Sequence, residues 1–170
     1  MSGDIGNPLL RQAEANIEGQ LTPENHQNYL KIVVAGMHAA LDKGPNGILA
    51  SLRQSKDPIS DAAKGAVAMV IVLRKEARGV MPFQAMVPAA MTLTLKALDF
   101  VSGARIANVG QPELVRATHI FTDAIFSAFG ISKAGLADAA SRVHALTQDP
   151  AALQKINAKA AAGHDEAMNG

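Results

Sequence analysis

The chain has 170 residues, no cysteine and a formal net charge of +1, and charged residues make up only 18% of it. This length suits one domain, and the lack of cysteine excludes disulfides, thiolate zinc sites and cysteine nucleophiles. Basic residues are spread along the chain rather than clustered, which argues against sequence-specific nucleic-acid binding.

Pairs of a capping residue and a proline predict where the helices begin. These pairs are Asn7-Pro8, Thr22-Pro23, Asp57-Pro58 and Asp149-Pro150. The side-chain oxygen can accept a hydrogen bond from an unpaired amide of the first turn, and proline has no amide to leave unpaired. A weaker cap at Gly110, before Gln111-Pro112-Glu113, predicts a further helix, and Ser132 can cap another.

Between these starts the apolar residues recur at helical spacing, and no segment alternates as a strand does. One stripe consists of Leu30, Val33, Val34, Met37 and Leu41, and another of Leu114, Thr118, Phe121, Ile125 and Phe129. We predict helices over 8–19, 23–43, 58–78, 80–102, 112–129 and 133–147, with shorter ones over 48–54 and 150–162.

The predicted fold class is all-α: a single-domain bundle of about six to eight helices around a central apolar helical hairpin. The domain is expected to span 1–170. Within it, 1–22 is an N-terminal arm or helix, 58–102 is the apolar hairpin, and 148–170 is a C-terminal helix and tail.

The hairpin is the most unusual segment of the sequence. Gly65 to Leu73 is apolar on every side of a helix, and Gly79 to Leu95 carries no charge. A helix that is apolar all round belongs in the middle of a bundle, while a partner copy or a membrane offers alternative cover. Pro88 lies inside the second helix and is expected to kink or divide it, with Pro82 near its start.

Eight residues of the hairpin are predicted to serve either the core or self-association. They are Val67, Val70, Ile71, Met81, Phe83, Met86, Met91 and Leu95. Methionine adapts to both settings because its side chain is flexible. The residues alone leave open whether the hairpin is core, interface or membrane-facing.

No pattern of catalytic or cofactor-binding residues stands out, so we predict no enzyme, no cofactor and no metal site. The chain has no Gly-x-Ser-x-Gly turn and no glycine-rich phosphate loop, which are the commonest local signatures of serine hydrolases and nucleotide-binding proteins. His38 with Asp42 and His119 with Asp123 stand one helical turn apart, a spacing that suits local surface pairs better than a metal site.

The cysteine-free, alanine-rich chain, its Gly65 to Leu95 hairpin and its lack of catalytic signatures resemble, in general character, the small helical structural proteins of tailed bacteriophages. Portal-neck components and the internal ejection proteins that build a DNA conduit are examples. The resemblance rests on no shared motif, so it transfers no functional residue. It implies a virion protein, found in the virion or the host cell envelope, with other virion proteins as partners.

The leading functional prediction is a non-enzymatic homo-oligomer that forms a ring, tube or shell. Small residues let helix backbones approach, and the few aromatics, 4% of the chain, leave little bulk to fill a self-contained core. One alternative is a cytoplasmic helical binding module or regulator that takes an amphipathic segment of a partner. Another is a protein that inserts conditionally into a membrane.

Overall fold

The computed structural model describes residues 5–42 and 48–130, which form six helices and no strand. The helices are α1 (Pro8–Gly19), α2 (Pro23–Asp42), α3 (Ile48–Gln54), α4 (Pro58–Glu76), α5 (Phe83–Gly103) and α6 (Gln111–Ala128). The all-α prediction is therefore confirmed. The helices predicted over 133–147 and 150–162, the caps at Ser132 and Asp149, and the tail over 148–170 lie outside the described residues.

The helices begin where the capping residues predicted. The side chains of Asn7, Thr22 and Asp57 accept hydrogen bonds from the backbone N–H groups of Leu9, Asn25 and Ser60, at 3.0, 3.4 and 3.2 Å. At α6, Glu113 Oε2 accepts the Gly110 N–H at 2.9 Å, which is one half of a capping box. Asp57 also binds Arg116 of α6, and this contact lowers the pKa of the Asp57 carboxyl.

The hairpin helices are shorter at the turn than predicted. The helix predicted over 58–78 ends at Glu76, and the helix predicted over 80–102 begins at Phe83. Arg78 stops α4 because it adopts the left-handed conformation, with φ of 52°. Its N–H bonds to Lys75 O, and the Gly79 N–H bonds to Arg74 O, which is the hydrogen-bond pattern of a Schellman motif.

We expected Pro88 to kink or divide the second hairpin helix. The structure shows that it does not divide the helix. The helix α5 runs without a break from Phe83 to Gly103, with Pro88 inside it. Proline in the interior removes one backbone hydrogen bond and crowds the carbonyl four residues before it. The residues of α5 around Pro88 that are buried in the bundle, Ala85, Met86, Ala89 and Ala90, supply packing that offsets this loss.

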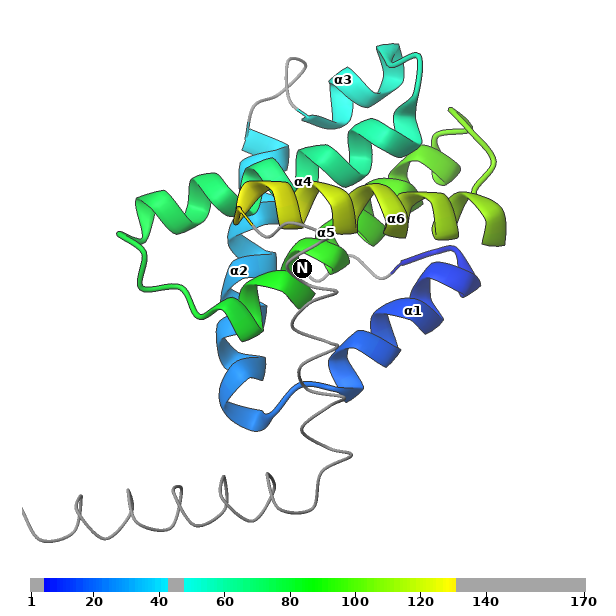
Figure 1. Ribbon diagram of the computed structural model, residues 1–170. Coiled ribbons are helices and arrows are strands. Elements are labelled where there is room, and N and C mark those ends of the chain that lie inside the picture. Colours follow the sequence, from blue (N-terminus) through cyan, green and yellow to red (C-terminus); the bar gives the residue numbers. More distant parts are fainter. Residues whose placement is uncertain (1–4, 43–47, 131–170) are drawn as a thin grey trace, which may run out of the picture. The chain divides into compact units, whose positions relative to one another are not determined.

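The α4–α5 hairpin is the centre of the bundle (Figure 1). The helix α5 packs against each of the other five helices, and its most extensive contact is with α4, which also packs against α2, α3 and α6. The buried residues in the second half of α5 include Leu93, Leu95, Leu98 and Val101. The hairpin is thus placed where its apolar sequence predicted.

A glycine lets α2 approach α5 closely. A Cβ atom added to Gly36 would lie 2.5 Å from Leu93 Cδ1 and 3.2 Å from Met69 Sδ, distances shorter than van der Waals contact. The side of α2 that faces the core is therefore built from Gly36 and its neighbours Tyr29, Ile32, Val33 and Ala40, all of which are buried.

All six helices belong to one compact unit, Met1–Ala128, and the chain from Phe129 to Gly170 forms another. The second unit lies almost entirely outside the described residues. The prediction of one domain spanning 1–170 therefore stays a prediction.

Candidate functional site

The eight hairpin residues proposed for core or self-association separate into two groups. Val67, Val70, Met86 and Leu95 are buried in the bundle. Ile71, Met81 and Met91 are partly buried, and Phe83 is exposed. The fold does not bring the eight together into one surface, so the apolar surface of the molecule has to be sought elsewhere.

A regular row of exposed apolar side chains lies on α2. Leu30, Val34 and Leu41 are exposed to 43%, 54% and 60%, and Met37 between them is partly buried. We call these four residues the α2 stripe. Their spacing of four, three and four residues is the spacing of the apolar seam of a coiled coil.

The sequence pattern located this stripe but did not tell which of its members face the core. Val33 is buried, whereas Leu30, Val34 and Leu41 point away from the bundle. The close approach at Gly36 turns the side of α2 that carries Tyr29, Ile32 and Val33 toward the core and leaves Leu30, Val34 and Leu41 on the exposed flank.

Three further exposed apolar side chains lie at or near the turn of the hairpin. Val72 near the end of α4, Val80 in the turn and Phe83 at the start of α5 are exposed to 52%, 81% and 43%. We call these three residues the hairpin tip. They include one of the eight predicted residues, Phe83, and lie beside another, Met81.

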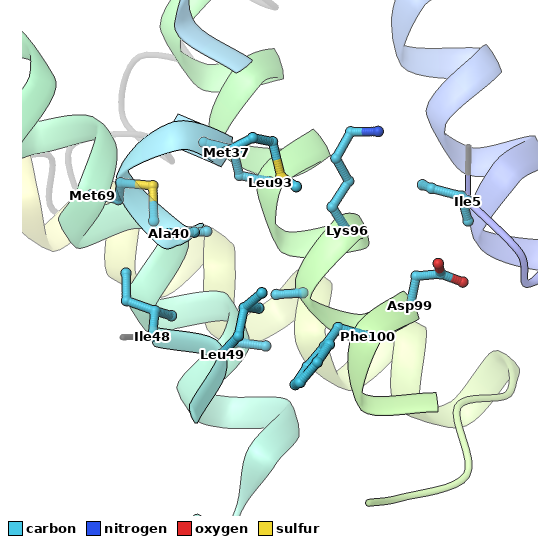
Figure 2. Close-up of a pocket in the computed structure, with 13 residues that line it drawn as sticks. Ile5, Met37, Ala40, Ile48, Leu49, Met69, Leu93, Lys96, Asp99 and Phe100 are labelled. Atoms are coloured by element: carbon cyan, nitrogen blue, oxygen red, sulfur yellow. The ribbon is translucent and has the colours of Figure 1, made fainter. Parts of the chain in front are cut away.

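An apolar pocket opens between α2, α3, α4 and α5, beside the α2 stripe (Figure 2). Its volume is about 260 Å³. It is lined by Ile5, Met37, Ala40, Ile48, Leu49, Ala62, Ala66, Met69, Leu93, Lys96, Ala97, Asp99 and Phe100. The alanines on α2, α4 and α5 explain the space, because none of them reaches across the gap between the helices.

The two charged residues of the pocket wall are both paired. Lys96 Nζ lies 3.0 Å from Glu14 Oε1 of α1, and the two side chains are exposed to only 8% and 18%. The Asp99 carboxylate accepts the backbone N–H groups of Gly6 and Asn7, at 3.1 and 2.9 Å. Figure 2 shows both polar ends on the side of α5 toward Ile5, away from Met69 and Ile48.

A buried hydrogen bond joins α2 to α5 near this ion pair. The Tyr29 hydroxyl lies 2.9 Å from Thr92 Oγ1, and it also donates to Glu18 Oε1 at 3.4 Å. Burial raises the pKa of Tyr29 to about 12, and the nearby carboxylates of Glu18 and Glu14 add to the shift. The phenol is therefore neutral at physiological pH and acts as a structural hydrogen-bonding group.

The histidine pairs considered for metal binding do not gather into a site within the described residues. No group of three or more His, Cys, Asp or Glu there could hold a metal ion. His38 and His119 are both exposed. The side chain of Asp42, the neighbour of His38, lies outside what the structure describes, as do His144 and His164.

Among the described helices, α5 is by length and composition able to cross a membrane. However, 61% of its most apolar window is buried inside the bundle. The central helix of a bundle has the same length and composition, and the contacts of α5 with the five other helices account for its apolar sequence.

The sequence did not single out the pocket or its charged pair. Lys96 is the first charge after the long uncharged segment from Gly79 to Leu95. This position was the one feature of the sequence that could have drawn attention to the charged pair. Its partner Glu14 is on a different helix and far away in sequence, so no local spacing connects them. In comparisons with known proteins, no family model, no curated protein and no solved structure matches this chain.

Proposed function

We propose that this chain is a non-enzymatic structural protein that assembles with copies of itself, and that the α2 stripe is its main pairing surface. The observation that carries the proposal is the exposed seam of Leu30, Val34, Met37 and Leu41. Exposed apolar side chains in a regular helical row are typical of helix pairing. Burying the exposed half of each of these side chains in an interface stabilises the pairing by on the order of 1 kcal/mol.

The stripe is complementary to itself in an antiparallel arrangement. When two copies of α2 pair around a two-fold axis through the middle of the stripe, Leu30 faces Leu41 of the second copy and Val34 faces Met37. Each apolar residue thus meets another, as an isologous interface requires. This self-complementarity favours a second copy over the amphipathic helix of an unrelated partner.

The charges beside the stripe also favour the antiparallel arrangement. Lys31 follows Leu30 and is exposed. In antiparallel pairing the two Lys31 residues are separated by roughly 13 Å along the helix axis, at a rise of about 1.5 Å per residue. That separation exceeds the screening length of about 10 Å at 0.1 M salt, so like charges do not oppose each other.

Pairing through α2 alone ends at a dimer, because a two-fold interface is closed. A ring, tube or shell needs a second contact, and the proposal assigns that contact to the hairpin tip of Val72, Val80 and Phe83. The resemblance to tailed-phage structural proteins suggests that the assembly is part of a virion, with other virion proteins as partners. It does not indicate which residues would contact those partners.

The test is the absolute mass of the purified full chain in solution, measured by light scattering after size exclusion. We expect the native chain to form an assembly of many times 17.7 kDa. Val34→Glu should remove the pairing, because an unpaired carboxylate would be buried in the seam. Val80→Glu should leave dimers and remove larger species.

Val115→Glu is the matched control. Val115 lies on α6, outside both surfaces, and is exposed to 45%, like the members of the stripe. This variant should assemble as the native chain does, and circular dichroism should find all three variants folded. A folded Val34→Glu chain with the native mass, or a native chain that is a monomer, would contradict the proposal.

A further inference from the structure

The geometry points to a binding site for a small neutral apolar molecule in the pocket between α2, α3, α4 and α5. The pocket shares Met37 with the α2 stripe and no residue with the hairpin tip. Its ligand class follows from the volume of the pocket, from the side chains that line it and from the state of its two charged residues.

The volume sets the size of the ligand. The pocket holds about 260 Å³, which lies between a cavity of roughly 150 Å³ that accepts benzene and the pockets of about 300 Å³ or more that hold drug-sized molecules. A short alkyl chain or a pair of fused rings fits this space. Met37, Met69 and Ile48 on its wall are only partly buried, so the pocket reaches the molecular surface.

The lining sets the polarity of the ligand. Apart from Lys96 and Asp99, every lining side chain is aliphatic, a thioether or the ring of Phe100. Among the described residues, no buried side-chain nitrogen or oxygen lacks a hydrogen-bond partner. A polar ligand would therefore lose its hydration without finding a free group to bind.

The two charges exclude a charged ligand. An anion would have to draw Lys96 from Glu14, a pair that is mostly buried, and would leave that carboxylate without its partner. A cation at Asp99 would compete with the N–H groups of Gly6 and Asn7. Since both charges are already compensated, neutral molecules are the better match.

Two flexible methionine side chains, Met37 and Met69, form part of the pocket lining. Met37 lies on α2 and Met69 on α4, and Leu93 of α5 lines the same pocket (Figure 2). Flexible thioethers can move to enclose ligands of different shape. Their methyl groups therefore provide a direct signal of occupancy that requires no substitution.

The first test uses a matched pair of probes, 1-octanol and octanoate, which share a chain and differ in charge. Both are titrated against full-length chain saturated with 1-naphthylamine, a neutral fluorophore of two fused rings. We expect 1-octanol to displace the fluorophore at concentrations at least ~10-fold lower than octanoate, a discrimination of the size expected when one ligand leaves a buried charge unpaired. Equal displacement by the two probes would overturn the neutral-ligand inference.

The second test locates the site. Ala66→Leu and Ala97→Leu add bulk to the pocket from α4 and from α5 and should weaken fluorophore binding by about tenfold or more. Ala15→Leu, on the exposed side of α1, is the control and should bind as the native chain does. Because Ala97 is only partly buried, Ala97→Leu tolerates the added volume more easily than Ala66→Leu.

Methyl NMR of the native chain provides the readout that needs no variant. On addition of 1-octanol, the Met37 and Met69 methyl signals should shift, while that of the fully buried Met86, which does not line the pocket, should not. Unshifted Met37 and Met69 signals would overturn the inference. Val34→Glu should retain fluorophore binding, so failure of the assembly proposal and failure of this one give different results.

Discussion

At the level of single residues, the hydroxyl of Tyr29 has the most demanding environment in the bundle. Tyr29 and Thr92 are almost completely buried, and each hydroxyl uses the other as a partner across the α2–α5 contact. Burial favours the neutral phenol over the phenolate, which is why the pKa is raised to about 12. Because the Tyr29 hydroxyl donates to Glu18 Oε1, the Thr92 hydroxyl is the donor in the hydrogen bond between Thr92 and Tyr29.

We predict that Tyr29→Phe lowers the free energy of unfolding at neutral pH by about 1–2 kcal/mol, because Thr92 loses its partner in a buried site. The folded-state pKa lies above the unfolded value of 10.0. The contribution of Tyr29 is therefore fully present below about pH 10 and is lost as the pH rises toward about 12.

Urea denaturation of the native chain and Tyr29→Phe at increasing pH checks this prediction. The difference in stability between the two chains should shrink above about pH 10. Thr92→Val and the double variant complete the thermodynamic cycle. A stability difference that stays constant from neutral to alkaline pH would refute the role assigned to the phenol.

The sequence could not predict these pairings. Tyr29 with Thr92 and Glu14 with Lys96 join residues from different helices, and only the packing of α1 and α2 on α5 brings them together. Local spacing located the residues on helices but carried no information on which faces would meet. The same limit applies to Met81 and Phe83, which belong to the hairpin sequence but not to its buried part.

At the level of the elements, local chemistry accounts for most helix boundaries. The caps at Asn7, Thr22 and Asp57 were predictable because a short polar side chain before proline has few other structural uses. The ends at Arg78 and Arg105 were not predictable. Both residues adopt the left-handed conformation, with φ of 52° and 55°, in which glycine is the residue expected.

The end of α5 allows a matched test of this explanation. The Arg105 N–H bonds to Ser102 O, and the Ile106 N–H bonds to Val101 O, so Arg105 occupies the left-handed position of a Schellman motif. Arg105→Gly should raise the free energy of unfolding by about 0.5–1 kcal/mol, because relief of the strained φ exceeds the entropy that glycine gains in the unfolded chain.

Ala104→Gly, one residue earlier, is the control for that test. Ala104 has φ of −79°, which suits any residue, so glycine there should lower stability by about 0.5–1 kcal/mol. Thermal denaturation of the two variants should shift the midpoint in opposite directions. A destabilised Arg105→Gly chain would be incompatible with a strained helix end.

At the level of the whole molecule, hydrophobicity predicted the centre of the bundle correctly. The α4–α5 hairpin is apolar on nearly all sides, and burial against the other helices is the arrangement that removes most of its surface from water. The outer surface was harder to predict. The apolar row on α2 was visible in the sequence, but its orientation depends on Gly36 and its contact with Leu93.

The absence of large side chains at Ala62, Ala66 and Ala97 has a consequence for the whole bundle. These alanines line the pocket, and their short side chains leave the space between the helices open. The sequence indicated close helix packing through its alanines but could not tell where they would gather, because that depends on how four helices cross.

Cysteine crosslinking can show whether two copies pair antiparallel through α2. The native chain has no cysteine, so Leu30→Cys and Leu41→Cys introduce single reactive positions. When chains carrying each substitution are mixed and oxidised, the account predicts a disulfide between Leu30→Cys and Leu41→Cys chains. Leu30→Cys alone should give none, because its two copies are roughly 16 Å apart along the axis. A dimer of Leu30→Cys with itself, or no disulfide in the mixture, would contradict the account.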